Sequence, residues 1–281
     1  MFIPTFWASA RGSTTTPDRR ELELVAWGWS GTSDADARAN ADARLARIME
    51  RVGRGDPLPH KYTYGDRPIR EERLDQLDGP DGAPLFVVTR NVYGSLVLNA
   101  TRALFIDVDE PPPRRSGGLL GMLFGRKPPE LPSPTLDRIR RALQGLSPRS
   151  FRVYRTAAGY RVLGVDREYT PEADEALGIM SQVGSDPNYI QLCKVQKSFR
   201  ARLTPKPWRC GTPTPPGRFP RSEPLEQAFQ QWVPTYEQGC RDWATCALIE
   251  QIGDAATHDN VKAVLELHDR MTRVGSGLGL A

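Results

Sequence analysis

The first part of the chain combines an apolar stretch of strand length with a long amphipathic stretch. Residues 22–29 are mainly apolar and aromatic, which predicts a strand. Ser33 then precedes an alanine-rich stretch with apolar residues at helical spacing, so Ser33 is expected to cap a helix that runs to about residue 52. Residues 53–84 are rich in Gly, Pro, Asp and Arg, and we expect only one short helix there, near residues 70–77.

Three β-rich stretches follow at residues 85–89, 95–99 and 103–108. Turn residues separate them, so we expect neighbouring strands of one sheet. Residues 111–134 are rich in Pro, Gly and Arg and predict a flexible insertion. Thr135 then begins an amphipathic stretch and is expected to cap a helix that ends near residue 146.

The second half of the chain begins with a predicted hairpin, in which residues 151–154 and 160–165 flank a turn containing glycine. Residues 171–182 have a helical pattern, and residues 189–195 and 198–203 are expected to be strands. The hydrophobic pattern as a whole therefore predicts an α+β protein with a mostly antiparallel sheet and flanking helices.

Two parts are expected in the chain, an α/β core over residues 1–222 and a helical extension over residues 223–281. The helices of the extension are predicted at residues 225–236, 244–252 and 260–273. No stretch reaches the roughly 18 apolar residues that a membrane-spanning helix needs, and the first residues lack the pattern of a signal peptide. We therefore expect a cytoplasmic protein without a membrane span.

The charge of the chain is unevenly distributed, although a net charge of +4 is only mildly basic. No Asp or Glu lies between Pro187 and Ser222. The cations of this segment are Lys194, Lys197, Arg200, Arg202, Lys206, Arg209, Arg218 and Arg221. Such a stretch indicates a phosphate-bearing partner, whether a nucleotide, a nucleic acid or an anionic lipid. Phe199, Trp208 and Phe219 lie among these cations and are candidates for stacking on bases, with packing inside the protein as the simpler interpretation of each.

Asp107 and Asp109 end an apolar strand and are the main candidates for chemistry. Because side chains of a strand alternate between its faces, both carboxylates point to the same side. Two such carboxylates can hold Mg²⁺ or Mn²⁺, which takes further ligands from substrate phosphates. The same Asp-x-Asp pattern also occurs where it only ends a strand, so the pair alone does not identify a function.

The order of motifs after the pair carries more information. A hairpin with Gly159 in its turn follows, then Asp186, then a basic segment over residues 193–207. This order resembles the archaeo-eukaryotic primase, or primase-polymerase, superfamily. Members of that family carry a strand-borne Asp-x-Asp, a Ser-Gly-x-x-Gly-x-His hairpin, a further Asp and a basic segment, and the resemblance covers about residues 85–207.

The resemblance implies a primase-polymerase-like core and a set of roles for individual residues. Asp107 and Asp109 would bind Mg²⁺ or Mn²⁺ for nucleotidyl transfer, and Asp186 would be the third catalytic carboxylate. The phosphates of a nucleoside triphosphate or nucleic acid would contact Arg155, Arg161, Arg200, Arg202 and Lys206. Arg161 departs from the family, because it stands where the family has histidine. Arginine retains a bidentate phosphate contact but cannot act as a neutral imidazole, so binding is a firmer expectation than catalysis.

Three alternatives compete with this hypothesis. A haloacid-dehalogenase-type phosphatase also uses a strand-end Asp-x-Asp, but Gly253, Asp254 and Asp259 fit its later motif poorly. A non-enzymatic module would bind nucleic acid or a partner protein through the basic segment alone. The third alternative is a zinc site. Because the chain has no Cys-x-x-Cys pair, reduced thiols that bind no metal are the simpler expectation. The candidate zinc ligands are Cys193, Cys210, Cys240, Cys246 and His258.

Overall fold

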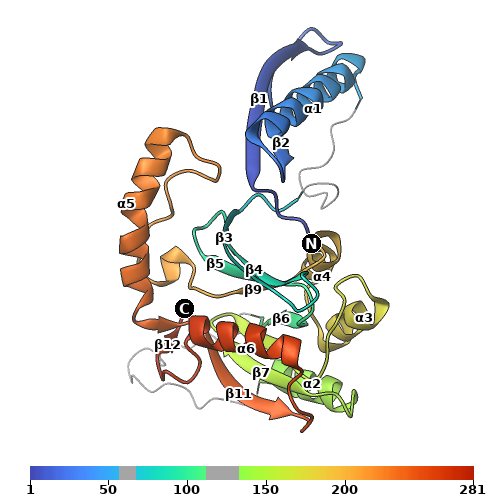
Figure 1. The fold of residues 1–281 in the computed structure, drawn as a ribbon, viewed down its shortest axis with the longest axis vertical. Helices are drawn as coiled ribbons and strands as arrows, with labels where there is room; N and C mark the ends of the chain where they lie inside the picture. Colours follow the sequence, from blue (N-terminus) through green and yellow to red (C-terminus); the bar gives the residue numbers. More distant parts are fainter. Residues whose placement is uncertain (57–67, 112–132) are drawn as a thin grey trace, which may run out of the picture.

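The computed structural model describes residues 1–56, 68–111 and 133–281. Within these ranges the protein is an α+β structure with two four-stranded antiparallel sheets and a separate hairpin, which confirms the predicted α+β class with antiparallel strands (Figure 1). The prediction of one sheet for residues 85–89, 95–99 and 103–108 is wrong, because the strand at residues 105–109 belongs to a different sheet from the other two. The insertion predicted at residues 111–134 lies almost entirely outside the described residues. In the described ranges, no helix combines the length and the apolar character needed to cross a membrane.

A hairpin and a helix form an arm at the N-terminus that extends away from the rest of the molecule (Figure 1). β1 (Phe6–Thr15) pairs with β2 (Glu21–Ser30), and α1 (Asp34–Arg54) packs on one face of the pair. The side chain of Ser33 caps α1 as predicted, by accepting a hydrogen bond from the backbone of the first turn. Gly28 permits the close packing of β2 on α1, since a Cβ there would lie 2.1 Å from the backbone nitrogen of Ala41 in α1.

The first four-stranded sheet has the strand order β3-β4-β5-β9. Its strands are β3 (Glu72–Asp78), β4 (Pro84–Arg90), β5 (Leu96–Ala100) and β9 (Phe199–Arg202). The helix predicted near residues 70–77 is wrong, because this segment forms β3. β3 is a largely exposed edge strand, and its pairing with β4 outweighs the local preference of its charged residues for a helix.

The second four-stranded sheet has the strand order β11-β7-β8-β6. Its strands are β6 (Phe105–Asp109), β7 (Phe151–Thr156), β8 (Gly159–Gly164) and β11 (Cys246–Ile252). The predicted hairpin is confirmed as β7 and β8. The helix predicted at residues 244–252 is wrong, because this segment pairs with β7, with an irregularity in the register that breaks the simple alternation expected of a strand.

The helices and short elements connect and cover these sheets. They are α2 (Pro134–Gln144), α3 (Asp174–Val183), α4 (Pro187–Gln196), η2 (Pro207–Arg209, a 3₁₀ turn), α5 (Glu223–Cys240), β10 (Trp243–Ala244), α6 (Asp259–Thr272) and β12 (Gly279–Leu280). Ser133, and not Thr135, caps α2. The strand predicted at residues 189–195 is wrong, because Asp186 caps a helix in which Pro187 occupies the first turn.

The main apolar core lies among the two sheets, α2, α3 and α6. Cys246 of β11 and Val261 and Val264 of α6 belong to this core, so the C-terminal segment completes it. β9 is an edge strand of the first sheet and β6 is an edge strand of the second, and the two lie next to each other without pairing. The two halves of the core therefore meet at these two strands.

Candidate functional site

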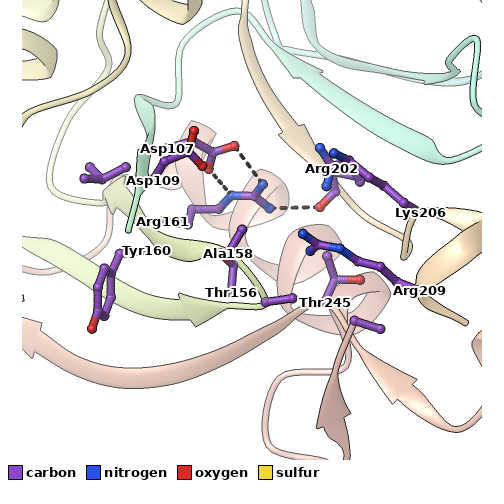
Figure 2. Close-up of a pocket in the computed structure, with 13 residues that line it drawn as sticks. Asp107, Asp109, Thr156, Ala158, Tyr160, Arg161, Arg202, Lys206, Arg209 and Thr245 are labelled. Carbon is purple, nitrogen blue, oxygen red and sulfur yellow. Dashed lines mark hydrogen bonds and ion pairs between the residues drawn. The ribbon is translucent and has the colours of Figure 1, made fainter. Parts of the chain in front are cut away.

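The candidate site lies where β6 and β9 meet. The Tyr189 hydroxyl lies between the carbonyl oxygens of Phe105 in β6 and Arg200 in β9, at 3.3 and 2.6 Å. Beside this junction is a pocket of about 90 Å³, into which β6 brings Asp107 and Asp109 (Figure 2). The pocket therefore depends on both sheets.

Asp107 forms a two-point ion pair with Arg161. The strands β6 and β8 pair so that these residues are direct partners. Arg161 Nε and Nη2 donate to the two carboxylate oxygens of Asp107 at 2.7 and 3.1 Å (Figure 2). The Arg161 side chain is only 3% exposed and that of Asp107 is 38% exposed. Burial is the largest single influence and lowers the pKa of Arg161, but the charge and hydrogen bonds of Asp107, together with the nearby Cys246 and Tyr189, outweigh it and the pKa is raised.

Three further groups surround the Arg161 guanidinium. Its Nη1 donates to the carbonyl oxygen of Arg202 at 2.8 Å and to Cys246 Sγ at 3.6 Å, and it lies 3.4 Å from His268 Nε2. Because arginine only donates, His268 Nε2 is the acceptor, and the Nδ1 of the ring carries the proton that Asp269 accepts at 2.9 Å. Burial lowers the pKa of His268, which agrees with this neutral form. Arg161 is thus held on all sides and does not extend freely into the pocket.

Three cations line the opposite side of the pocket: Arg202 at the end of β9, and Lys206 and Arg209 around η2 (Figure 2). Burial lowers the pKa of Arg202; the charge of Asp107 opposes this effect, and the charges of Arg161 and Arg209 add to it. Burial also lowers the pKa of Lys206, with contributions from the charges of Arg202 and Arg209. The three side chains are close enough to repel one another, so the pocket favours an anion.

No protein-family model, curated protein or solved structure matches the chain. The resemblance to the primase-polymerase superfamily accordingly rests on the order of motifs in the sequence. The roles of the site residues follow from their geometry alone.

The structure brings only some of the predicted site residues to the pocket. Asp107, Asp109, Arg161, Arg202 and Lys206 line it. Other predicted residues are engaged elsewhere: Asp186 caps α4, Arg155 pairs with Glu110 at 2.5 Å, and Arg200 pairs with Glu71 at 2.7 Å and donates to Asn99. The structure therefore does not unite these three residues with the Asp pair.

The residues of the pocket do not fit the two-metal centre that the resemblance implies. Both oxygens of Asp107 already accept hydrogen bonds from Arg161. The third predicted carboxylate, Asp186, is the cap of α4. In the described part of the chain, no group of three or more His, Cys, Asp or Glu side chains is arranged to hold a metal ion. Of the two carboxylates, only Asp109 has no salt bridge to an arginine among the described residues.

The ion pair also bears on the phosphatase alternative. The Arg161 fork donates a hydrogen bond to each oxygen of Asp107, which draws electron density from the carboxylate and makes it a weaker nucleophile. Within residues 1–56, 68–111 and 133–281, no cluster of side chains is arranged as the zinc alternative requires. Cys210 and Cys240 lie 3.8 Å apart at sulfur, and Cys193 and Cys246 are buried separately in the main core.

Arg209 and Thr245 are two polar residues of the pocket that were not predicted as site residues. Arg209 belongs to the segment without Asp or Glu, and that segment was the signal for it. Thr245 lies between β10 and β11, with its hydroxyl donating to Leu203 at 3.0 Å. No motif in the sequence marks Thr245, because the pairing of β11 with β7 brings it to the pocket.

Proposed function

We propose that this protein binds a phosphate-bearing ligand, a nucleotide or a nucleic-acid strand, in the pocket between β6 and β9. One observation carries the proposal. Arg202, Lys206 and Arg209 converge on the pocket, and within the described residues none of the three has a salt bridge to a carboxylate. A bound phosphate would relieve their mutual repulsion and provide the acceptors that their donors lack.

The arrangement of the other cations supports this choice. Arg155, Arg161 and Arg200 each have a carboxylate partner, so their charge is compensated within the fold. By contrast, three cations without a salt bridge to a carboxylate among the described residues lie together at the pocket, within the short segment from β9 to η2. Clustered cations of this kind are expected where an anion binds, whereas cations that only keep a surface in contact with water are usually dispersed.

Asp109 favours a nucleotide over inorganic phosphate. Its carboxylate faces the same pocket and accepts hydrogen bonds, whereas the three cations only donate them. The phosphate oxygens of a nucleotide would accept hydrogen bonds from the three cations, and its sugar hydroxyls or base amino groups would donate to Asp109. The proposal ends at binding, because the ion pair with Arg161 neutralises the charge of Asp107 and weakens one of the two carboxylates that metal-dependent nucleotidyl transfer would use.

Fluorescence anisotropy with a labelled single-stranded oligonucleotide, competed by ATP, tests the proposal. Lys206→Gln and Arg209→Gln should each weaken binding about tenfold or more, because a hydrogen bond to a charged group contributes about 1.5–3 kcal/mol. Each substitution should also reduce the salt dependence by about one counterion. Binding is measured both in EDTA and in Mg²⁺. In the metal-dependent alternative the affinity depends on Mg²⁺ and on Asp107, whereas the present proposal expects binding in EDTA as well.

Lys194→Gln is the matched control. Lys194 is exposed, lies in the same segment without Asp or Glu, and is not part of the pocket. Its substitution changes the net charge by the same amount, so it should weaken binding far less than Lys206→Gln. Equal losses in the two variants would show that binding follows the total charge and not this pocket, and the proposal would then be wrong.

A further inference from the structure

An exposed pair of aromatic side chains lies just outside the pocket. Trp208 is 50% exposed and Tyr93 is 45% exposed. Their ring centroids are 5.4 Å apart and their planes meet at 89°. By contrast Phe199, the aromatic residue of β9, is fully buried. Two large rings held half in water forgo much of the stabilisation that burial gives, so the pair is a candidate contact surface.

Hydrogen bonds and packing determine the backbone position of Tyr93. Tyr93 lies in the turn between β4 and β5, where the Asn91 side chain accepts hydrogen bonds from the backbone N–H groups of Tyr93 and Ser95 at 2.9 and 3.1 Å. Gly94 completes the turn with a φ of 83°, against the Trp232 ring of α5. The position of Tyr93 is thus set by the turn and by α5.

The same turn is fastened to the segment that carries Trp208. The Ser95 hydroxyl donates to the carbonyl oxygen of Pro205 at 3.0 Å, and the backbone of Leu96 donates to the Thr204 hydroxyl at 2.8 Å. These bonds join residues more than a hundred positions apart in the sequence. They explain why the two rings meet, and they place the pair next to the phosphate-binding cations.

Lys206 links the aromatic pair to the pocket. Its Nζ lies 5.4 Å from the centroid of the Trp208 ring, and the same side chain lines the pocket. Arg209, on the other side of Trp208 in sequence, also lines the pocket. An aromatic face next to phosphate-binding cations matches the layout of a nucleotide unit, in which the base adjoins its own phosphate.

We propose that Tyr93 and Trp208 form a stacking platform for a base of single-stranded nucleic acid whose phosphates contact Lys206 and Arg209. This inference rests on the proposed function and narrows its ligand to a strand, because the platform lies beyond the pocket and suits a chain that continues out of it. Every base has a π face, so the platform should accept all four bases with little sequence preference.

The experiment compares two oligonucleotides of equal length and charge, one of thymidines and one with abasic sugars throughout. Trp208→Ala should weaken binding of the thymidine strand roughly 5- to 100-fold and leave the abasic strand unchanged, because only the base contacts the ring. Trp208→Phe should retain most of the affinity, since it keeps an aromatic face. Phe2→Ala is the matched control, because Phe2 is 54% exposed and does not line the pocket.

The outcomes separate this inference from the proposed function. Equal losses for both strands, or no loss for either, in a Trp208→Ala protein with unchanged melting would overturn the platform. If the abasic strand still binds and loses affinity in Lys206→Gln, the proposed function stands and only the platform fails. If neither strand binds in a way that depends on Lys206 and Arg209, both fail.

Discussion

The Asp107–Arg161 ion pair makes a prediction about stability. Asp107→Ala removes the charged partner of a side chain that is 3% exposed. Removing one member of a buried pair costs about 3–5 kcal/mol, because the other charge stays buried. Asp107 is itself 38% exposed, and Arg161 keeps acceptors on Arg202 and His268. We therefore expect the free energy of unfolding to fall by about 2–3 kcal/mol, below that range.

Asp109→Ala is the matched control for this prediction. Asp109 ends the same strand, is exposed, and has no salt bridge within the described residues. Its substitution should change the free energy of unfolding by no more than about 0.5 kcal/mol. A metal site predicts the opposite for Asp107, because two neighbouring carboxylates without their metal repel each other and removing either one relieves that repulsion.

Urea unfolding at pH 7 in EDTA, followed by tryptophan fluorescence and by circular dichroism, measures both variants. Coincident transitions by the two probes establish that a single free energy applies. A loss of about 2–3 kcal/mol also corresponds to a melting temperature lower by roughly 4–12 °C. If Asp107→Ala is as stable as Asp109→Ala, the ion pair does not stabilise the fold and the reasoning is refuted.

Two further predictions concern the arm and the buried histidine. Gly28→Ala should destabilise the arm by roughly 1–3 kcal/mol, because the new methyl group would clash with the backbone of α1. Gly53→Ala is the control and should not destabilise it, because nothing lies within 4 Å of a Cβ there. Hydrogen exchange of the α1 amides measures the difference between the two variants. Burial holds the pKa of His268 below 6.5, so the unfolded chain binds more protons and stability falls as pH drops below about 6.5. His268→Gln should weaken this dependence between pH 7 and 5, and an unchanged dependence would contradict the assignment.

The sequence predicted the elements whose signals are local. Ser33 and the spacing of alanines identified α1, and the glycine turn identified the β7/β8 hairpin. The strand that ends in Asp107 and Asp109 was also identified, because a short apolar run ends abruptly in acidic residues. In each case neighbouring residues determine the conformation, so a single sequence contains enough information.

Most of the failures involve contacts between distant residues. β3 and β11 have helix-favouring compositions, and only pairing with β4 and β7 makes them strands. The pairing of Asp107 with Arg161 depends on the register of β6 and β8, which no local pattern specifies. At Asp186 the local signal was present, since Asp followed by Pro is typical of a helix start, and the resemblance led to a catalytic assignment for that residue.

Arg161 also constrains how this site can change during evolution. Its guanidinium contacts β6 through Asp107 and the backbone of β9 through the carbonyl of Arg202, so it joins the edges of both sheets. A substitution to histidine would give up the contacts that the five guanidinium donors allow and leave Asp107 without its partner. A histidine at this position would therefore require compensating changes on two other strands, so a single substitution at position 161 cannot exchange one form of the site for the other.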